Sequence, residues 1–566
     1  MGDRAGSGFW FRVHGLRVRP VGTVFAPATG VLSPELLSAN LSALTGAQGA
    51  CPTLRALRDV VRVTPEGDDV RVEVHIANEG WQAIDFTGET SEASEWLERA
   101  LGGATQAVIA GIGPGRALDR ADAIGLRKVV LIEPDPGLAM LFLSRRDWRP
   151  WIAQGRLRLL TGPDFRGAAD AARIFDGLQD VPVVAHPLRA RLEPASIEGA
   201  TTIGQRIAKN ARANGEARRK FARPYLLQTL ANLPAIAREA GVEALDRAFD
   251  GVPAFVIGAG PSLDANIPAL REVQNRGVIV AADTALGPLV SGGIRPHLAV
   301  AADSSALNAR HLTSAPEAPD VMLAAEGSVH PTAFERFAGR TFTFLVSGHE
   351  PWPWLGAAGI RRGGLRTWGS VLTSAFDLAR RMGCDPIVFL GADLAFTGGR
   401  PYCRGTIYDA MWQEWIDKGC TWEQLMADYF SRQPEVWLDD VGGERVRTAP
   451  HLVSFRNWLV EEIGKTAAAC LNATGGGILH GGSIRQSTLP AALANAAPAP
   501  AIREILRDRH AAHRAARDDV RRLQELLSRA RTCRESVPFA RWQEATVLTV
   551  TAAEIAGALA IPAPAA

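Results

Sequence analysis

The sequence has few cysteines, and their spacing excludes the most familiar cysteine-based sites. Six cysteines are scattered over 566 residues and none forms a CxxC pair. We therefore expect neither a zinc site nor a disulfide framework. This cysteine usage fits a reducing compartment best, and we predict a cytoplasmic protein.

Long apolar runs are also missing. No uncharged apolar stretch approaches the roughly 18 residues that a transmembrane helix needs, so we expect no membrane partner. The first twenty residues carry arginines through their only apolar patch, which is not the pattern of a signal peptide.

A strong charge of either sign is absent as well. The formal net charge is +2, with 47% apolar and 22% charged residues. This balance is typical of a soluble globular protein and does not favour nucleic acid as a partner. A chain of this length exceeds one hydrophobic core, so about two to four domains are expected.

The most informative stretch that is present is AFVIGAGPSLD, residues 254–264. A short apolar run leads through glycines into a helical pattern, which indicates a strand, a tight loop and a helix. Such a junction aims backbone N–H groups and the positive end of a helix dipole at one point, which suits a phosphate or carboxylate. A purely structural turn is the alternative.

A second junction of this kind lies nearer the N-terminus. The strand AVIAG runs into Gly111 and the GIGPG loop, and the strand VVLIEPD reaches Glu133 22 positions later. This spacing favours a nucleotide site, in a form nearer to methyltransferases than to dinucleotide enzymes. The alternative is a Rossmann-like domain that only supports the fold.

Between residues 254 and 393 apolar strands alternate with helical patterns. Near-continuous apolar strands predict a parallel sheet buried between helices, and ligands bind outside the carboxyl ends of such strands. The polar residues that end these strands are therefore candidates: Asp283, Asp303, Glu326, Ser347 and Asp393.

Two further segments are helical and basic. Residues 194–249 form one of them, with arginines and lysines concentrated at 206–223 and a break expected at Pro224. A solvated helix face is the default interpretation, and a surface beside an anionic donor or an acceptor protein is the alternative. The other is a single helix over about residues 502–530.

Four segments, in order, resemble motifs of one family. They are Gly258-Ala-Gly260-Pro261-Ser262-Leu-Asp, Thr367-Trp-Gly369-Ser370-Val, Gly391-Ala-Asp393-Leu-Ala-Phe-Thr and Asn472-Ala-Thr474-Gly-Gly-Gly. Together they resemble the motility-associated factor (Maf) flagellin glycosyltransferases, whose central domain is similar to bacterial sialyltransferases and to 6-hydroxymethylpterin diphosphokinase (MptE-like) proteins. The helical segment before them resembles the asparagine-containing linker of that family.

The sequence departs from the family pattern at three places. His297 stands where the family commonly has Pro-Asp, Tyr402 replaces a histidine, and Gly475 replaces a glutamate. The identity of the general base is therefore open.

The resemblance implies an α/β protein with four parts. They are a Rossmann-like N-terminal domain (1–193), a basic helical linker (194–250), a sialyltransferase-like catalytic domain (251–488) and a helical C-terminal domain (489–566). The implied reaction moves a nonulosonic acid of pseudaminic or legionaminic type from a CMP-sugar to Ser/Thr of flagellin, as part of flagellum assembly and motility. No tightly bound cofactor is expected, and Mg²⁺ shared by Asp303 and Asp393 is an unfavoured alternative.

The predicted site residues follow from these motifs. Backbone and hydroxyl donors for the phosphate and the sugar carboxylate are expected at Ala259 to Ser262 and at Gly369 to Ser370. The catalytic candidates are Asp393, Asp303 and Tyr402, with His330 and His349 as weaker candidates for the base. The substrate-binding candidates are Gly258, Gly260, Pro261, Ser262, Asp283, Thr367, Gly369, Ser370, Asn472 and Thr474.

Two other functions remain open. An ATP-dependent hydroxymethylpterin diphosphokinase uses the same central fold. A non-catalytic flagellin-binding assembly factor would keep the glycine loops as relics.

Overall fold

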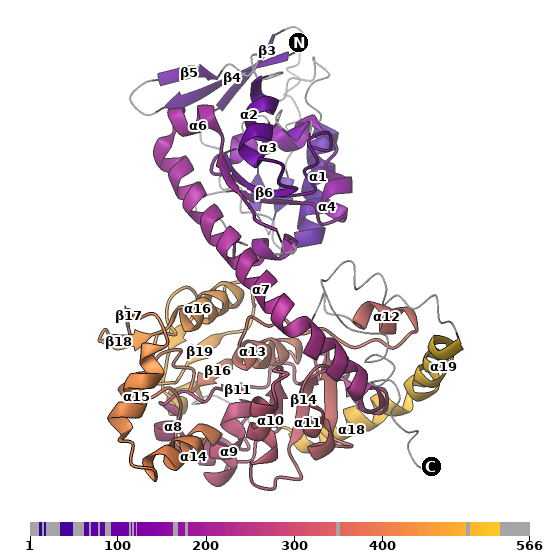
Figure 1. Cartoon of the computed structure of the whole chain (residues 1–566), viewed down its shortest axis with the longest axis vertical. Helices are drawn as coiled ribbons and strands as arrows, with labels where there is room; N and C mark the ends of the chain where they lie inside the picture. The colour runs from indigo at the N-terminus through magenta and orange to yellow at the C-terminus, as the bar shows by residue number, and fades with distance from the viewer. Residues whose placement is uncertain are drawn as a thin grey trace, which may run out of the picture. The chain divides into compact units, whose positions relative to one another are not determined.

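The computed structural model describes two compact units, Met1–Arg218 and Arg219–Ala566 (Figure 1). The residues described are 11–13, 16–18, 34–48, 61–66, 69–76, 80–84, 92–111, 115, 118–119, 121–161, 168–175, 179–346, 351–493 and 499–532. Part of the GIGPG loop and the predicted candidates Ser347 and His349 lie outside them. Each unit is described by itself.

The first unit contains a parallel sheet in the order β8-β7-β6-β9, as the sequence predicts. Its strands β6 and β7 are the two predicted apolar runs, and they are almost wholly buried. The strands of this sheet are β6 (Gln106–Ala110), β7 (Lys128–Glu133), β8 (Leu157–Thr161) and β9 (Val183–Ala185). Its helices are α1 (Pro34–Gln48), α2 (Glu92–Leu101), α3 (Pro136–Arg145), α4 (Arg149–Ala153), α5 (Ala168–Ala171) and α6 (Pro187–Leu192). Two antiparallel sheets accompany it, β1 (Phe11–Val13) with β2 (Leu16–Val18), and β3 (Val61–Glu66) with β4 (Asp69–Ile76) and β5 (Gly80–Ile84).

Helix α7 (Pro194–Arg238) begins in the first unit and ends in the second. It continues through Pro224, so the predicted break there is wrong. Apolar side chains before the proline, such as Ile207, pack in the core of the first unit, and those after it, such as Leu230, pack in the second. This packing offsets the cost of a proline inside a helix. The basic side chains described between 206 and 223 are exposed, as expected for a solvated face.

The second unit is built on nine parallel strands in the order β10-β15-β14-β13-β12-β11-β16-β19-β20. Six of them are the six predicted strands of the central domain, so the predicted α/β fold with a parallel central sheet is confirmed. The strands are β10 (Ala240–Gly241), β11 (Ala254–Ile257), β12 (Val278–Ala282), β13 (Leu298–Ala301), β14 (Met322–Glu326), β15 (Thr341–Phe344), β16 (Ile387–Leu390), β19 (Cys470–Asn472) and β20 (Arg485–Gln486).

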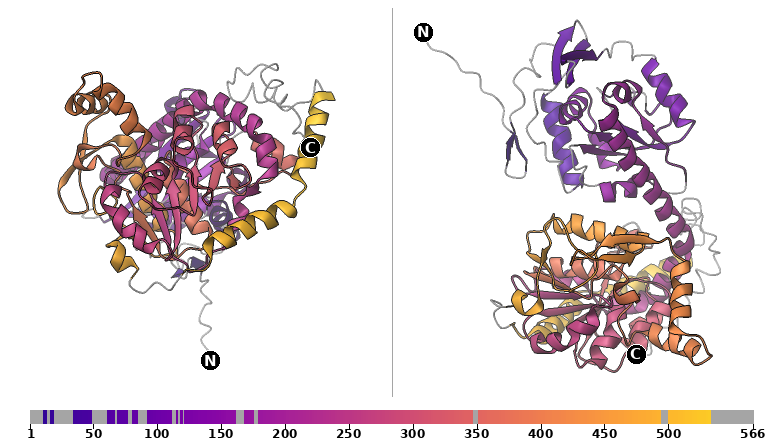
Figure 2. Two further views of the ribbon diagram at one scale, coloured as in Figure 1. Left: turned by 90° about the horizontal axis from the view of Figure 1, so that it is seen from below. Right: turned by 90° about the vertical axis from the view of Figure 1, so that its left-hand side faces the viewer.

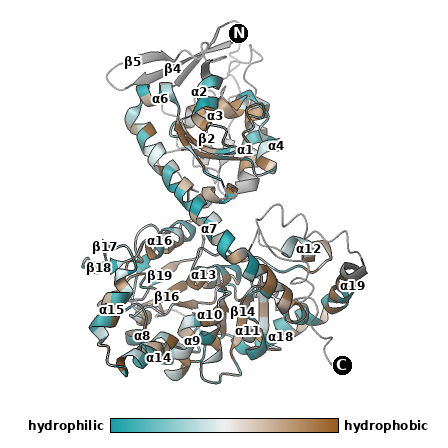
Figure 3. Ribbon diagram, viewed as in Figure 1, coloured by the Kyte–Doolittle hydropathy of each residue, from teal (hydrophilic) through white to brown (hydrophobic). Residues whose placement is uncertain are grey.

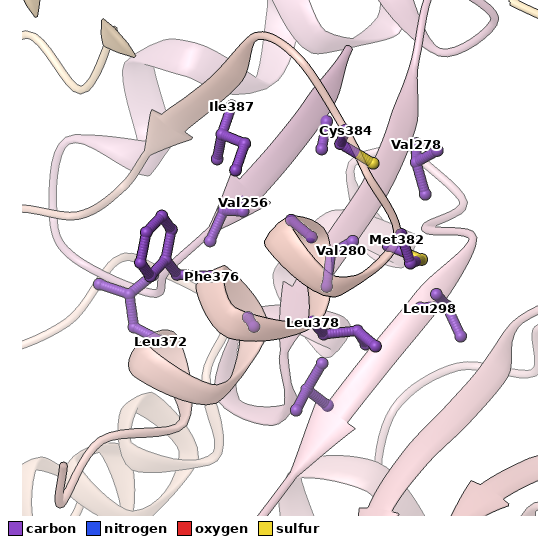
Figure 4. Close-up of a cluster of buried hydrophobic side chains, with 14 of the residues drawn as sticks. Val256, Val278, Val280, Leu298, Leu372, Phe376, Leu378, Met382, Cys384 and Ile387 are labelled. Carbon is purple, nitrogen blue, oxygen red and sulfur yellow. The ribbon is translucent and has the colours of Figure 1, made fainter. Parts of the chain in front are cut away.

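Helices cover both faces of this sheet, as Figures 1 and 2 show. One face packs against the end of α7 and against α8 (Leu263–Val273), α9 (Asp283–Ser291), α10 (Ala306–Thr313) and α11 (Pro331–Arg336). The other face packs against α13 (Val371–Arg381), whose Leu372 and Phe376 lie over Val256 of β11 (Figure 4). Teal and brown alternate along these helices in Figure 3, as expected for amphipathic helices between a core and solvent.

The remaining elements of the second unit lie between the strands of the sheet or after them in the chain. They are η4 (Val242–Leu245), α12 (Trp352–Ala357), η5 (Thr397–Gly399), α14 (Ile407–Ile416), α15 (Trp422–Ser431), the hairpin β17 (Val436–Asp439) and β18 (Arg445–Thr448), α16 (Pro450–Ile463), α17 (Leu489–Ala492), α18 (Ile502–Ala515) and α19 (Asp519–Thr532). The predicted helix 502–530 is thus two helices, because the chain turns where Asp519 pairs with the buried Arg362. Residues 240–245, predicted as part of a helical linker, instead form β10 and η4 at the sheet edge. The predicted domain boundaries themselves stay a prediction.

Among the described residues, no helix combines the length with the apolar content that a bilayer crossing requires.

The buried His297 makes stability depend on pH. Its pKa is lowered from 6.5 to about 3, chiefly by burial and also by the charge of Arg503, while Asp320 opposes the shift. Its Nδ1 accepts the Ile279 N–H at 2.9 Å. A depressed folded-state pKa gives stability that is complete above pH 6.5 and is lost as pH falls toward 3. We therefore expect the midpoint temperature of unfolding to fall across this window. In His297→Asn, whose amide oxygen also accepts a hydrogen bond, thermal scans at a series of pH values should show a smaller fall, and an equal fall in both proteins would contradict this role.

Candidate functional site

The second unit has a topological switch point between β11 and β16. The chain passes from β11 outward through β12, β13, β14 and β15, and then returns over the opposite face by α13 to β16 on the other side of β11. The loops that follow β11 and β16 therefore separate at one edge of the sheet. In open α/β sheets this is where ligands bind.

The loops after these two strands approach each other through glycines. The Gly258 N–H donates to the Leu390 carbonyl at 2.9 Å, and the Gly260 N–H donates to the Gly391 carbonyl at 2.8 Å. A Cβ on Gly258 would lie 2.5 Å from the Gly391 oxygen, and one on Gly260 would lie 2.1 Å from Oδ2 of Asp393. The two glycines are therefore required by the close packing of the loops, beyond any contact with a ligand.

Asp393 is hydrogen-bonded to the glycine loop that follows β11. Its side chain is fully buried, Oδ1 accepts the Ser262 hydroxyl at 2.6 Å, and the Ser262 N–H lies 3.3 Å from both carboxylate oxygens. Burial raises the pKa of this carboxyl, and the hydrogen bonds from Ser262 oppose the rise. Asp393 thus fixes the position of Ser262 at the start of α8.

Backbone strain accompanies this contact. Leu394 has a φ of 50°, a conformation that costs a residue with a side chain about 1–2 kcal/mol. The Thr448 hydroxyl holds it by donating to the Leu394 carbonyl at 2.7 Å. Strain held in place at a strand end is a common feature of functional sites.

These contacts revise where an anion would bind. In the segment 260–262, Pro261 has no N–H, and the N–H groups of Gly260 and Ser262 already donate to Gly391 and Asp393. The predicted phosphate donors at Ala259 to Ser262 are therefore mostly used within the protein. The other predicted set, at the N-terminus of α13, becomes the stronger candidate.

The start of α13 lies at the same edge. The Leu372 side chain is in van der Waals range of Gly258, with Cδ1 3.5 Å from a Cβ built there. Ser370 caps the helix by accepting the Leu372 N–H at 3.3 Å, and Thr367 Oγ1 lies 3.5 Å from Oγ1 of Thr373. Gly369 is exposed and has a φ of 69°, and a side chain there would meet Phe455. An exposed glycine at the start of an eleven-residue helix can receive an anion.

The segment Asn472-Ala-Thr474, at the end of β19, lies at the same edge of the sheet. The Thr474 hydroxyl accepts the Ala392 N–H at 3.1 Å, and the Thr474 N–H donates to Oδ1 of Asn472 at 3.1 Å. The Asn472 amide donates to the Leu479 carbonyl at 2.9 Å. Both side chains are buried, so they hold the β16 loop in place.

The acidic strand ends lie along the same edge. Asp283 is buried at the start of α9, whereas Asp303 is exposed and its Oδ1 accepts the Ser305 N–H at 2.7 Å.

In the sheet order β13-β12-β11-β16, three strand spacings, about 14 Å, separate the ends that precede Asp303 and Asp393. This spacing disfavours one Mg²⁺ bridging both. Among the described residues, no group of three or more His, Cys, Asp or Glu side chains is arranged to hold a metal ion.

The remaining base candidates differ in their surroundings. Tyr402 is half-buried and stacks on Tyr408, with ring centroids 4.6 Å apart. Burial raises its pKa well above 10, with contributions from Tyr408, Tyr429 and Asp283, so it is suited to donate a hydrogen bond rather than to accept a proton. His330 lies before α11, with Nδ1 2.9 Å from the Thr332 hydroxyl. The catalytic roles of these residues stay predictions.

In the first unit, Glu133 is not free to bind a ribose. Its side chain is fully buried and pairs with the equally buried Arg189 of α6 at 2.8 Å. Gly111 is packed as well, since a Cβ there would lie 2.6 Å from Ile197 and 3.2 Å from Arg189. This geometry favours the structural interpretation of the Rossmann-like domain over a working cofactor site.

Removal of one partner tests this pair. In Arg189→Ala the buried Glu133 carboxylate loses the cation that pairs with it, so we expect the first unit to lose about 3 kcal/mol of stability. The control is Arg149→Ala, which breaks an exposed pair with Asp147 and should leave the melting profile unchanged. Calorimetry of the whole chain measures both, and equal profiles for the two variants would refute the buried pair.

Residues 227–399 match the family model described as 6-hydroxymethylpterin diphosphokinase MptE-like. This part of the chain is similar to that family. The predicted similarity of the central domain to MptE-like proteins is thereby confirmed, and the match includes the β11 and β16 loops.

The chain is also similar to individual proteins. Two proteins of Treponema pallidum (strain Nichols), both described as uncharacterized, are 28% identical over 150 residues and 31% identical over 138 residues. The matches cover 26% and 21% of this chain, and 50% and 34% of those proteins. Among solved structures, a Maf glycosyltransferase from Magnetospirillum magneticum AMB-1 is 16% identical, with a TM-score of 0.46, over 86% of this chain and 78% of that one.

Some residues of this edge carry no signal in the sequence. Asn232 of α7 donates to the carbonyls of Gly327 and Val329 at 2.9 and 2.7 Å, and so fixes the helix to the end of β14. An asparagine in the linker is the only hint of this contact. Thr406 and Tyr408 follow the predicted Tyr402 closely in the chain, whereas His311 lies in no motif and only the fold brings it to Tyr408.

Proposed function

We propose that this chain is a cytoplasmic Maf-type glycosyltransferase. It moves a nonulosonic acid of pseudaminic or legionaminic type from its CMP-activated form to serine or threonine hydroxyls of flagellin, and thereby serves flagellum assembly and motility. The MptE-like domain supports the catalytic fold, and the ordered motifs that resemble the Maf family support the donor and the acceptor.

One observation carries the proposal. Four segments that are far apart in the chain, at Gly258, Gly369, Asp393 and Asn472, meet at the switch point of the sheet. The family motifs thus fall where the fold favours a ligand, although nothing in their chain positions requires this.

The geometry suggests how the donor is held. The exposed start of α13, with Gly369 and Ser370, offers N–H groups and a helix dipole to the CMP phosphate and the sugar carboxylate. Thr367 adds a hydroxyl. Asp393, Asn472 and Thr474 position the neighbouring loops from within the protein.

A second candidate is pyrophosphoryl transfer from ATP to a hydroxymethylpterin. The description of the matching family model favours it. The same anion site would then receive the phosphates of ATP.

Product release separates the two activities. The purified chain is incubated with CMP-pseudaminic acid and flagellin, and in parallel with ATP, Mg²⁺ and 6-hydroxymethylpterin. We expect CMP release that depends on flagellin. Release of AMP only, in the pterin reaction, would replace the proposal with the kinase. Flagellin binding without either product would favour a non-catalytic assembly factor.

A further inference from the structure

Two buried polar atoms at the carboxyl edge have no partner within the described part of the chain. They are Nε2 of His311 on α10 and Oγ1 of Thr406. The two residues are 3% and 4% exposed, and Thr406 precedes α14 without capping it. An unpaired buried polar atom costs about 1–3 kcal/mol, so each is a place where a bound molecule would gain a hydrogen bond.

His311 lies beside an aromatic pair, and Thr406 belongs to the chain segment that carries this pair. The His311 ring lies edge-on to Tyr408, with ring centroids 5.3 Å apart, and Tyr408 stacks on Tyr402 at 4.6 Å and an interplanar angle of 12°. Thr406 lies between these tyrosines in the chain. The preceding Gly405 lies against α9, with its carbonyl oxygen 3.5 Å from a Cβ built on Gly287.

Two carboxylates face the same aromatic pair. Burial raises the pKa of Tyr408, and the charges of Asp283 and Asp303 raise it further. Burial lowers the pKa of His311 to about 4; the charge of Asp303 opposes this shift, and the charge of the neighbouring Arg310 contributes to it. Asp283 begins α9, the helix against which Gly405 packs, and Asp303 comes shortly before α10, the helix that carries His311. Both carboxylates therefore lie on chain segments that lead into the helices around the tyrosines.

The charge of this cluster selects among ligands. A nucleotide sugar with a phosphate and a sugar carboxylate is anionic, and two carboxylates would repel it, because neither forms an ion pair within the described part of the chain. A hydroxyl group donates readily to a carboxylate and accepts from a tyrosine or a neutral histidine. The cluster therefore fits a neutral hydroxyl-bearing molecule.

We propose that Asp283, Asp303, His311, Tyr402, Thr406 and Tyr408 form the acceptor-hydroxyl subsite, in which the Asp283 carboxylate is the general base. This inference rests on the proposed glycosyltransferase function. The acceptor oxygen bonds to the anomeric carbon of the sugar, the bond from that carbon to the phosphate oxygen breaks, and CMP leaves with the electron pair. The hydroxyl proton passes to Asp283.

The sheet order favours Asp283 over Asp303 for this step. Strand β12, which ends directly before Asp283, is the neighbour of β11, about 5 Å away, whereas the strand before Asp303 is one place further from the switch point. Burial also raises the pKa of Asp283 to about 7, hydrogen bonds from Thr284 oppose this rise, and the charge of Asp303 adds to it. A base is most effective when its pKa lies near the working pH.

Three variants of the full-length chain test the subsite. Asp283→Asn removes the base, His311→Gln replaces the unpartnered ring, and the control His297→Asn changes a buried histidine at the amino end of β13. For each, titration calorimetry measures CMP affinity, and intact mass follows transfer from CMP-pseudaminic acid to flagellin over a range of pH. Thermal melting verifies that each variant is folded.

We expect Asp283→Asn to lose at least about 100-fold in transfer rate, and to lose the rise in rate with pH near 7, while its CMP affinity stays within about twofold. His311→Gln should raise KM for flagellin more than it lowers kcat. This variant still tests the subsite if Asp283→Asn does not fold. The control should match the unaltered protein near pH 7.

The outcomes distinguish the two proposals. If Asp283→Asn lost CMP affinity as well as transfer rate, the cluster would belong to the donor site, and the proposed acceptor subsite would be overturned. Unchanged transfer by both Asp283→Asn and His311→Gln would also overturn it. If the unaltered protein neither binds CMP nor transfers the sugar, the proposed function itself fails.

Discussion

Replacement of Gly260 by alanine is expected to reduce sugar transfer at least about 100-fold and to lower stability by about 1–3 kcal/mol. The added methyl group would lie 2.1 Å from Oδ2 of Asp393 and 2.7 Å from the Gly391 carbonyl oxygen. Both neighbours sit on the rigid end of β16, so the glycine loop has to move away from it. That movement breaks the hydrogen bonds between Ser262 and Asp393. It also displaces the residues of the candidate site, and the rate of transfer falls steeply when reacting groups are misplaced.

A matched glycine serves as the control for this variant. Gly356 lies in α12 of the same unit, and a Cβ there meets nothing within 4 Å. Gly356→Ala should therefore retain activity and match or slightly exceed the stability of the unaltered protein. Initial rates of CMP release and thermal melting measure both variants. Equal activity of the two would show that the close approach of the β11 and β16 loops is not needed for function.

Replacement of Arg362 by alanine is expected to produce the largest loss of stability, about 5 kcal/mol. The side chain is fully buried, pairs with Asp519 of α19 at 2.7 Å and donates to the Thr343 hydroxyl of β15 at 2.7 Å. It also donates to the carbonyl of Ile236 in α7. Alanine would remove the fully buried partner of Asp519, leaving it with the more exposed Arg517 at 3.0 Å and Arg522 at 3.6 Å, and would take away the donor that α19, β15 and α7 share.

The neighbouring residue provides the control, since Arg361 is exposed and Arg361→Ala should scarcely change the melting temperature. A double variant, Arg362→Met with Asp519→Leu, should recover much of the loss, because it removes both buried charges together. Denaturant titration of the full chain measures all three variants. A single Arg362→Ala variant as stable as Arg361→Ala would refute the buried pair.

The sequence predicts the strands well because each is a short, nearly continuous apolar run with a polar residue at its end. Strands β11 to β16 and the acidic positions after them follow from this pattern alone. The order of the strands does not, because β16 pairs with β11 only through the return of the chain by α13. The contact between Ser262 and Asp393, 131 positions apart, depends on that order and escapes local reasoning.

Other differences between the sequence-based predictions and the structure also arise from contacts between distant parts of the chain. Pro224 predicts a helix break by its local chemistry, but the cores on both sides keep α7 continuous. The glycine loop predicts free phosphate donors at Ala259 to Ser262, whereas in the fold the Gly260 N–H donates to the Gly391 carbonyl and the Ser262 N–H to Asp393. His311 has no motif around it and becomes a candidate only when its buried nitrogen is found without a partner in the described structure.

The intact mass of flagellin tests the central claim most directly. Flagellin is co-expressed with this chain and a CMP-nonulosonate synthesis pathway, and in parallel with the Gly260→Ala variant. We predict that flagellin gains mass in whole multiples of one nonulosonic acid residue with the unaltered chain, and gains little or none with the variant. An unchanged flagellin mass in cells that contain both the folded chain and the CMP-sugar would contradict the account.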